Sequence, residues 1–217
     1  MWGLAAIYLI NLVLYAGPLT LAGVGIQSNA DVPRWFTGVV GSEPGLAMVY
    51  LAGFIQNSAY LLGFTIATFV ATHLALLLTV QSKGILPTAY SVVYSSSVYV
   101  AGIFTVVWYL TTASGVAAAR DFVIDIQVAF IYALIEYAGA DVEYAVPRPE
   151  TLAASGFSQL GEYALLSLFV LVGYFFYSLY LGARINHDAD RIASAATVLV
   201  VVSLPIAYVL GSILVAT

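Results

Sequence analysis

The sequence predicts an all-α protein: a polytopic membrane helix bundle with five transmembrane helices plus one amphipathic or short extra helix. Two observations lead to this fold class. The 217-residue chain is 62% hydrophobic and only 8% charged, whereas a soluble domain carries about 25% charged residues. The apolar residues are also gathered in long runs, and a run of about 20 suffices to cross the hydrocarbon core of a bilayer as a helix. We expect a single integral membrane domain over residues 1–217.

Five apolar runs are the predicted spans, at about residues 4–26, 46–80, 88–118, 163–181 and 193–215. The second run would form a helix of about 50 Å and the third is also long, while the hydrocarbon core is only about 30 Å thick. These two helices must therefore tilt or project beyond the membrane. Residues 119–160 read as an insertion on the outer face of the membrane.

The insertion contains a short apolar stretch, FVIDIQVAFIYALIEYA, which covers 122–138. Asp125, Gln127 and Glu136 interrupt it, and its length is at the lower limit for a span. The pattern favours a helix that lies on the membrane surface or packs on the projecting ends of spans two and three; a sixth span is the alternative. Asp125 and Glu136 are about three turns apart and could form a cation site, but solvated surface acids are the favoured interpretation.

A ridge of small residues is predicted along span two. Its members follow one another at intervals of four, which predicts one shared helix face: Ala59, Gly63, Ala67, Ala71 and Ala75. Small residues allow close approach of helix backbones in lipid, where no hydrophobic force drives association. We expect this ridge to pack against span three, span five or another subunit.

Span three carries an unusual number of hydroxyl groups. Tyr90, Tyr94 and Ser97 recur at intervals of three or four, with further serines beside them: Ser91, Ser95 and Ser96. Hydroxyls in lipid form hydrogen bonds to the helix backbone or across helices. This structural role is favoured over a polar translocation path because the same helix has no charge to pair with the hydroxyls.

The two histidines lie at the ends of predicted spans. His73 falls inside span two near its end, and the sequence predicts a structural hydrogen bond to Tyr90 or Tyr94 across the turn that contains Gly84. His187 lies in the last connection, GARINHDADR, beside Asp188 and Asp190. These three could be metal ligands, but the chain has no cysteine and no third histidine. A solvated loop is the favoured interpretation.

The number and distribution of charged residues indicate the orientation of the protein in the membrane and the kind of organism it comes from. The net charge is −5, with one lysine against five arginines. A sparse acidic surface with so little lysine fits a salt-adapted, archaeal-type prokaryote and argues against nucleic-acid binding. The basic residues are densest in the connections 81–87 and 182–192. Basic connections favour the cytoplasm, so we expect a plasma-membrane protein with a cytoplasmic N-terminus.

Two stretches resemble the YIP family, five-span membrane proteins related to the Golgi proteins that bind Rab GTPases. The first reads THLALLLTVQSKGILPTAYSVVYSSSVYVAGIF, and the second reads YFFYSLYLGARINHDADRIASAATVLVVVSLPIAYVL. The positions that fall on the family pattern are His73, Gly84, Tyr90, Ser91, Tyr177 and His187. The match departs from that pattern in its single turn glycine and in the inserted segment 112–160. The resemblance implies a five-span fold more than an activity.

Two functions remain open at this point. The first is a non-enzymatic, YIP-like scaffold or organiser of membrane partners, whose own partners are the lipid bilayer and other membrane proteins or further copies of itself. The second is a transporter or channel component, or a small subunit of a larger membrane complex. An enzyme is not expected, because the chain lacks the GxSxG, HExxH, P-loop and GxGxxG motifs. No cofactor and no metal are predicted.

Overall fold

The computed structural model describes residues 2–26, 45–79, 81–110, 113–139, 147–149 and 158–216. These residues form six α-helices: α1 (Trp2–Ile26), α3 (Leu46–Leu78), α4 (Ile85–Leu110), α5 (Ala113–Ala138), α6 (Gln159–Asn186) and α7 (Arg191–Ala216). No strand occurs in the described ranges. The all-α fold class is therefore confirmed.

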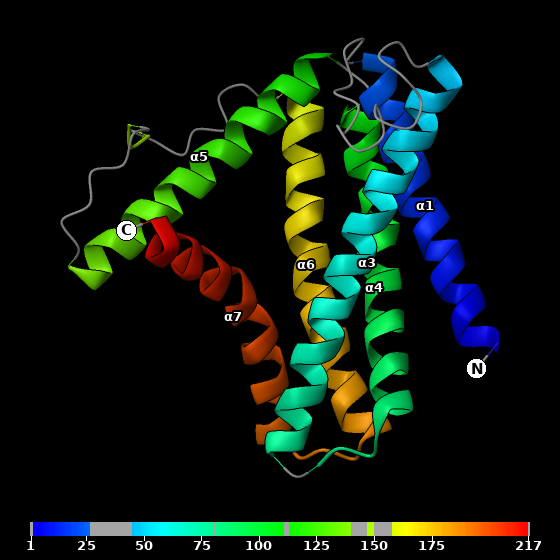
Figure 1. Ribbon diagram of the computed structural model, residues 1–217, viewed down its shortest axis with the longest axis vertical. Coiled ribbons are helices and arrows are strands. Elements are labelled where there is room, and N and C mark those ends of the chain that lie inside the picture. The colour runs from blue at the N-terminus through cyan, green and yellow to red at the C-terminus, as the bar shows by residue number, and fades with distance from the viewer. Residues whose placement is uncertain are drawn as a thin grey trace.

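The bundle is built around α4 and α6, which make the most extensive interhelical contact of the described chain. α3 lies beside α4 and also contacts α1 and α7, and α1 packs against both α3 and α4 (Figure 1). α7 contacts α3 and α6 near its start and leans away from the bundle toward the C-terminus. Its splayed end leaves much of α7 outside the central packing.

Three helices are long and apolar enough to cross a membrane, counting only the residues that the structure describes: α1 over Trp2–Leu21, α3 over Leu46–Leu78 and α6 over Gln159–Asn186. α7 has a shorter apolar stretch, Arg191–Leu204. Large apolar side chains are exposed along these helices, for example Leu9, Ile66 and Leu166. Exposing so much apolar surface to water would be unfavourable, whereas the same surface suits contact with lipid tails. The structure thus agrees with an integral membrane protein, and five crossings remain a proposal.

The predicted third span is wrong at its far end. The expected run to residue 118 is divided between two helices, since α4 ends at Leu110 and α5 begins at Ala113. α5 starts beside the end of α4 and then slopes away from the bundle (Figure 1). Hydropathy is continuous through this region, so it does not reveal the boundary between α4 and α5. The run TTASG, residues 111–115, was an available signal, because threonine, serine and glycine are weak helix formers.

The helix within the insertion is longer than expected. Its start is Ala113 rather than residue 122, and its end at Ala138 agrees with the prediction. It contacts the end of α4, one of the two helices with which packing was expected, and then extends away from the bundle. The other predicted span limits hold to within a few residues, although α6 begins and ends four or five residues beyond the expected 163–181.

The core lies where α3, α4, α6 and α7 meet. One buried cluster joins Ala71, Val92, Phe175, Leu179 and Val201. A second joins Leu76, Ala183, Ala189 and Ala193 at the end of the bundle where α3 and α6 end and α7 begins. Small residues in the second cluster let the helix ends approach closely, as expected for packing in lipid.

Candidate functional site

Two connections lie together at one end of the bundle and are joined by hydrogen bonds (Figure 1). They are residues 81–84, between α3 and α4, and residues 187–190, between α6 and α7. We refer to these eight residues as the clasp. Their association agrees with the expectation that the basic connections 81–87 and 182–192 share one side of the molecule.

His73 binds Thr88 and not a tyrosine. Its Nδ1 lies 3.0 Å from the Thr88 Oγ1, and its ring stacks on Phe69 with 5.8 Å between ring centroids. The expected partners, Tyr90 and Tyr94, stack on each other instead, at 6.1 Å. A threonine at the first turn of α4 reaches His73 because α3 and α4 are adjacent at the clasp. The structural hydrogen bond is confirmed, but its predicted partner is wrong.

His187 is buried, with 3% of its surface exposed, so the expected solvated loop is wrong for this residue. The backbone N–H of Lys83 donates to its Nδ1 at 3.0 Å. Its Nε2 lies 3.3 Å from the same Thr88 Oγ1 that binds His73. The two histidines are therefore joined through one fully buried threonine hydroxyl.

The two carboxylates of the clasp, Asp188 and Asp190, bind partners other than His187. Asp188 forms an ion pair with Lys83. Asp190 accepts from the Gln81 side chain at 2.9 Å and from the Ala193 backbone N–H at 2.7 Å, which caps the start of α7. Hydrogen bonding by Lys83, with its charge, lowers the pKa of Asp188. Hydrogen bonds from Ala193 and Gln81 lower the pKa of Asp190.

Because of these bonds, the three possible metal ligands His187, Asp188 and Asp190 point in different directions. Asp188 and Asp190 are exposed, whereas His187 is directed inward at Lys83 and Thr88. Across the described ranges, no three histidine, aspartate or glutamate side chains are grouped closely enough to hold a metal ion.

Gly84 closes the clasp at the start of α4. Its φ of +108° lies in the region that glycine adopts readily and that other L-residues avoid. Its carbonyl oxygen accepts from the Thr88 hydroxyl at 3.1 Å. The turn glycine singled out in the sequence is therefore needed for backbone geometry, and it orients the threonine that links the histidines.

The hydroxyl groups of α4 divide between two faces. Tyr94 is 50% exposed, while Ser91, Ser95 and Ser96 are buried. Ser95 donates to the Ser91 carbonyl at 2.7 Å and Ser96 to the Val92 carbonyl at 2.9 Å. The hydroxyls of Ser95 and Ser96 thus donate to backbone carbonyls of their own helix, in agreement with the structural role expected of them.

Further polar pairs connect α4 to its neighbours. The Ser95 Oγ lies 2.9 Å from the Ser178 Oγ on α6, and the Asn186 side chain donates to the Ser91 Oγ at 2.9 Å. On the other side, Asn11 of α1 donates to the Ser97 Oγ at 2.7 Å. The sequence interpretation assigned no role to Asn11, Ser178, Asn186 or Thr88. The available signal was a polar amide or hydroxyl in or beside an apolar run.

The predicted ridge of small residues does not form one face. Ala71 and Ala75 are buried, whereas Ala59, Gly63 and Ala67 are exposed. A step of four residues advances by about 40° beyond a full turn, so the drift reaches about 160° over the five positions. The buried face of α3 follows a mixed three- and four-residue spacing through Leu61, Thr65, Thr68, Thr72, Ala75 and Leu76.

This division predicts different effects for two leucine substitutions. Ala71→Leu should lower the free energy of unfolding by about 1–3 kcal/mol, because it overfills the cluster that includes Phe175 and Leu179. Ala67→Leu should leave stability in detergent nearly unchanged. Thermal melts of both variants would measure this difference. Equal destabilisation by the two changes would contradict the division of the ridge.

Asp125 and Glu136 do not act as a pair. Glu136 accepts a hydrogen bond from Arg148, in the segment that follows α5. The Arg148 guanidinium lies 5.9 Å from the centroid of the Tyr132 ring on the preceding turn. Both charged side chains of this ion pair are largely exposed. The arrangement ties the following chain to α5 and fits surface acids better than a cation site.

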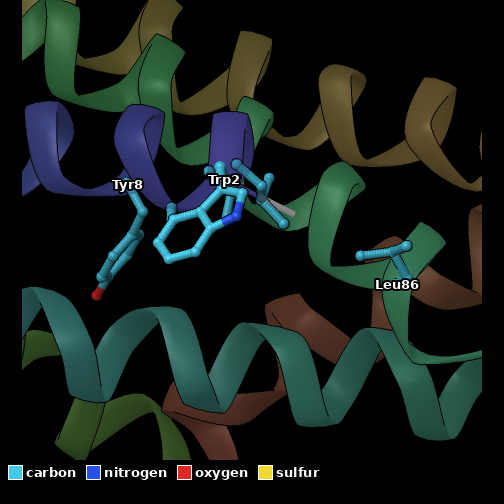
Figure 2. Close-up of a pocket in the computed structure, with 6 residues that line it drawn as sticks. Trp2, Tyr8 and Leu86 are labelled. Atoms are coloured by element: carbon cyan, nitrogen blue, oxygen red, sulfur yellow. The ribbon is translucent and has the colours of Figure 1, made fainter.

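An apolar groove of about 560 Å³ lies between the start of α1 and α4 (Figure 2). Trp2 and Tyr8 of α1 line one side and Leu86 of α4 lies on the other. A smaller groove of about 240 Å³ shares Tyr8 and Val93 with it and continues to Phe69. The described residues that line the two grooves include no charged side chain, so this lining suits hydrocarbon.

The clasp can bind or release a proton at His187, and it can hold the α3–α4 and α6–α7 hairpins together. The Thr88 hydroxyl between the His73 and His187 rings does not resemble a nucleophile with an activating base, because no carboxylate among the described residues bonds to either histidine. Comparison with models of protein families, with curated proteins and with solved structures gives no match for this chain.

Proposed function

We propose that the chain is a non-enzymatic, YIP-like integral membrane protein that acts as a scaffold for membrane partners. The observation that carries this proposal is that the serines of α4 find their hydrogen-bond partners within the bundle. The serines of α4 bond to their own helix, to Ser178 and Asn186 of α6 and to Asn11 of α1. A helix interface closed in this way supports a sealed bundle with surfaces left for partners.

The proposed topology has five crossings, formed by α1, α3, α4, α6 and α7. It is supported by the clasp, because connections joined by hydrogen bonds must lie on the same side of a membrane. A sixth crossing by α5 between α4 and α6 would place them on opposite sides. Lys83, Arg184 and Arg191 at this end favour the cytoplasm, and the N-terminus is then cytoplasmic too. The prokaryotic plasma membrane remains part of this proposal.

Cysteine accessibility tests the sealed bundle directly, because the chain has no native cysteine. Ser96→Cys places a thiol at a position that is 1% exposed, and a membrane-impermeant maleimide should not label it in native membranes. Arg191→Cys, exposed at the start of α7, is the matched control and should be labelled from the clasp side. Rapid labelling of Ser96→Cys would contradict the sealed bundle.

The alternative is a transporter or channel component. One observation favours it: half-buried His73 and the buried residues Thr88 and His187 form a polar chain that connects α3, α4 and the end of α6. This function requires water to reach that chain and the serines beyond it. Labelling of Ser96→Cys that a transported ion or solute blocks would support the alternative over the scaffold.

A further inference from the structure

The clasp contains a buried histidine whose hydrogen bonds specify where its proton lies. A backbone N–H can only donate, so the Lys83 amide requires an unprotonated Nδ1 on His187. Neutral histidine then carries its proton on Nε2, which faces the Thr88 Oγ1 at 3.3 Å. We propose that the clasp is a proton-sensitive latch, in which protonation of His187 at Nδ1 releases residues 81–84 from residues 187–190.

The Thr88 hydroxyl fits this protonation state. Its oxygen accepts from the His187 Nε2, and its single proton has two candidate acceptors, the Gly84 carbonyl at 3.1 Å and the His73 Nδ1 at 3.0 Å. The network is complete when His187 is neutral. A second proton on His187 has only the Lys83 N–H in front of it, and two donors cannot bond to each other.

Among the residues that the structure describes, none of the groups around His187 offers it a counter-charge. His73 on α3 and Lys83 in the facing loop are both basic, and Arg184 on α6 donates to the Ala189 carbonyl at 3.0 Å. The two nearby carboxylates are bonded elsewhere, Asp188 to Lys83 and Asp190 to Gln81 and Ala193. Burial lowers the pKa of His187, and the charges of His73 and Lys83 lower it further.

Because the pKa of His187 is lowered in the closed clasp, the direction in which pH changes the stability of the closed clasp follows. The closed clasp binds a proton on His187 more weakly than the open clasp does, so the closed form is favoured at high pH. Its advantage is complete above the ordinary histidine pKa of about 6.5. The advantage is lost as the pH falls from that value toward the lowered pKa of the closed form. Within this window the opening equilibrium changes by at most about tenfold per pH unit.

Release of the latch has a clear structural consequence. α7 begins at Arg191, immediately after the clasp, and Asp190 caps its first turn. α7 also leans out of the bundle over its second half (Figure 1). Opening of the clasp would therefore free the start of α7 from the α3–α4 hairpin and expose the buried Thr88 hydroxyl to the aqueous side.

Amide hydrogen exchange followed by mass spectrometry tests the latch on the full chain in lipid nanodiscs. Peptides that cover residues 81–88 and 186–193 should lose protection as the pH is lowered from 7.5 to 5.0, after correction for intrinsic exchange rates. Peptides from the centre of α6 should keep theirs. In His187→Asn, a side-chain oxygen can accept from the Lys83 N–H without titrating, and protection should be independent of pH.

A second variant distinguishes the latch from a general loss of structure. His73→Asn removes one basic group that opposes protonation of His187, so opening should move to higher pH in this variant. Asp188→Asn removes the exposed ion pair with Lys83 and should retain a pH-dependent opening. Constant protection of the wild type across this pH range would overturn the proposal. An unchanged transition in His187→Asn, or an unmoved midpoint in His73→Asn, would overturn it as well.

Discussion

Gly182→Ala is expected to destabilise the bundle by about 1–3 kcal/mol, because the new methyl group has no space at the interface of α4 and α6. A Cβ at position 182 would lie 2.7 Å from the Ser91 Cβ and 3.2 Å from the Ser91 Cα. A backbone atom cannot move aside without moving its helix. Glycine to alanine within a helix is otherwise favourable by roughly 0.5–1 kcal/mol, so the clash must exceed that gain.

The displaced helix would also weaken polar contacts on either side. Asn186 bonds to Ser91 near the clasp, and Ser178 bonds to Ser95 one turn further into the bundle. Thermal unfolding in detergent, followed by circular dichroism, measures the effect. Gly173→Ala on the same helix is the matched control, because nothing lies within 4 Å of its added Cβ; this change should leave stability equal or slightly higher.

A double-mutant cycle locates the clash. Ser91→Gly removes the atoms that an added methyl group meets first, so Gly182→Ala should cost much less in that background. Ser91→Ala keeps the Cβ and should restore little. Equal melting temperatures for Gly182→Ala and Gly173→Ala would show that α4 and α6 do not approach each other as closely as described.

Leu179→Ala is expected to lower the free energy of unfolding by about 2 kcal/mol. Leu179 is 0% exposed and packs with Val92, Phe175 and Val201 where α4, α6 and α7 meet. Leucine truncations in soluble cores cost about 2–5 kcal/mol through lost transfer energy and the cavity that remains. In lipid the surroundings are as apolar as the core, so the cavity accounts for most of the loss and the effect falls at the lower end.

Leu166→Ala provides the control for this prediction. Leu166 lies on the same helix but is 62% exposed, so its removal creates no internal cavity. Chemical unfolding in mixed micelles, or thermal aggregation measured by fluorescence, should show a large loss for Leu179→Ala and a small one for Leu166→Ala. A loss of the same size at both positions would contradict the location of the core.

Individual glycine and alanine positions differ in whether their structural role could be predicted from the sequence. Gly84 could be predicted because a turn between two apolar runs needs a residue that tolerates positive φ. The ridge at Gly63, Ala67 and Ala71 was predicted wrongly, because a four-residue spacing drifts around the helix and no chain pattern shows which side meets a neighbour. Gly182 was missed, since a glycine within an apolar run looks the same whether it touches another helix or lipid.

The histidines show the same limit. Their positions at the ends of apolar runs predicted that each would need a partner or water, but the identity of that partner depends on which helices meet at the clasp. Thr88 joins His73 to His187 from 15 residues away on one side and 99 on the other. Contacts at such separations leave no periodic signal in a single sequence.

The sequence by itself determined the helical class, the apolar character that suits a bilayer and the approximate limits of most helices. These follow from composition and run length, because each residue in lipid must satisfy its backbone locally and present an apolar side chain outward. Only the tertiary structure decided which face of each helix is buried, where α4 gives way to α5, and that one threonine connects two histidines. Those properties depend on the relative placement of helices, and that placement is set by packing between distant parts of the chain.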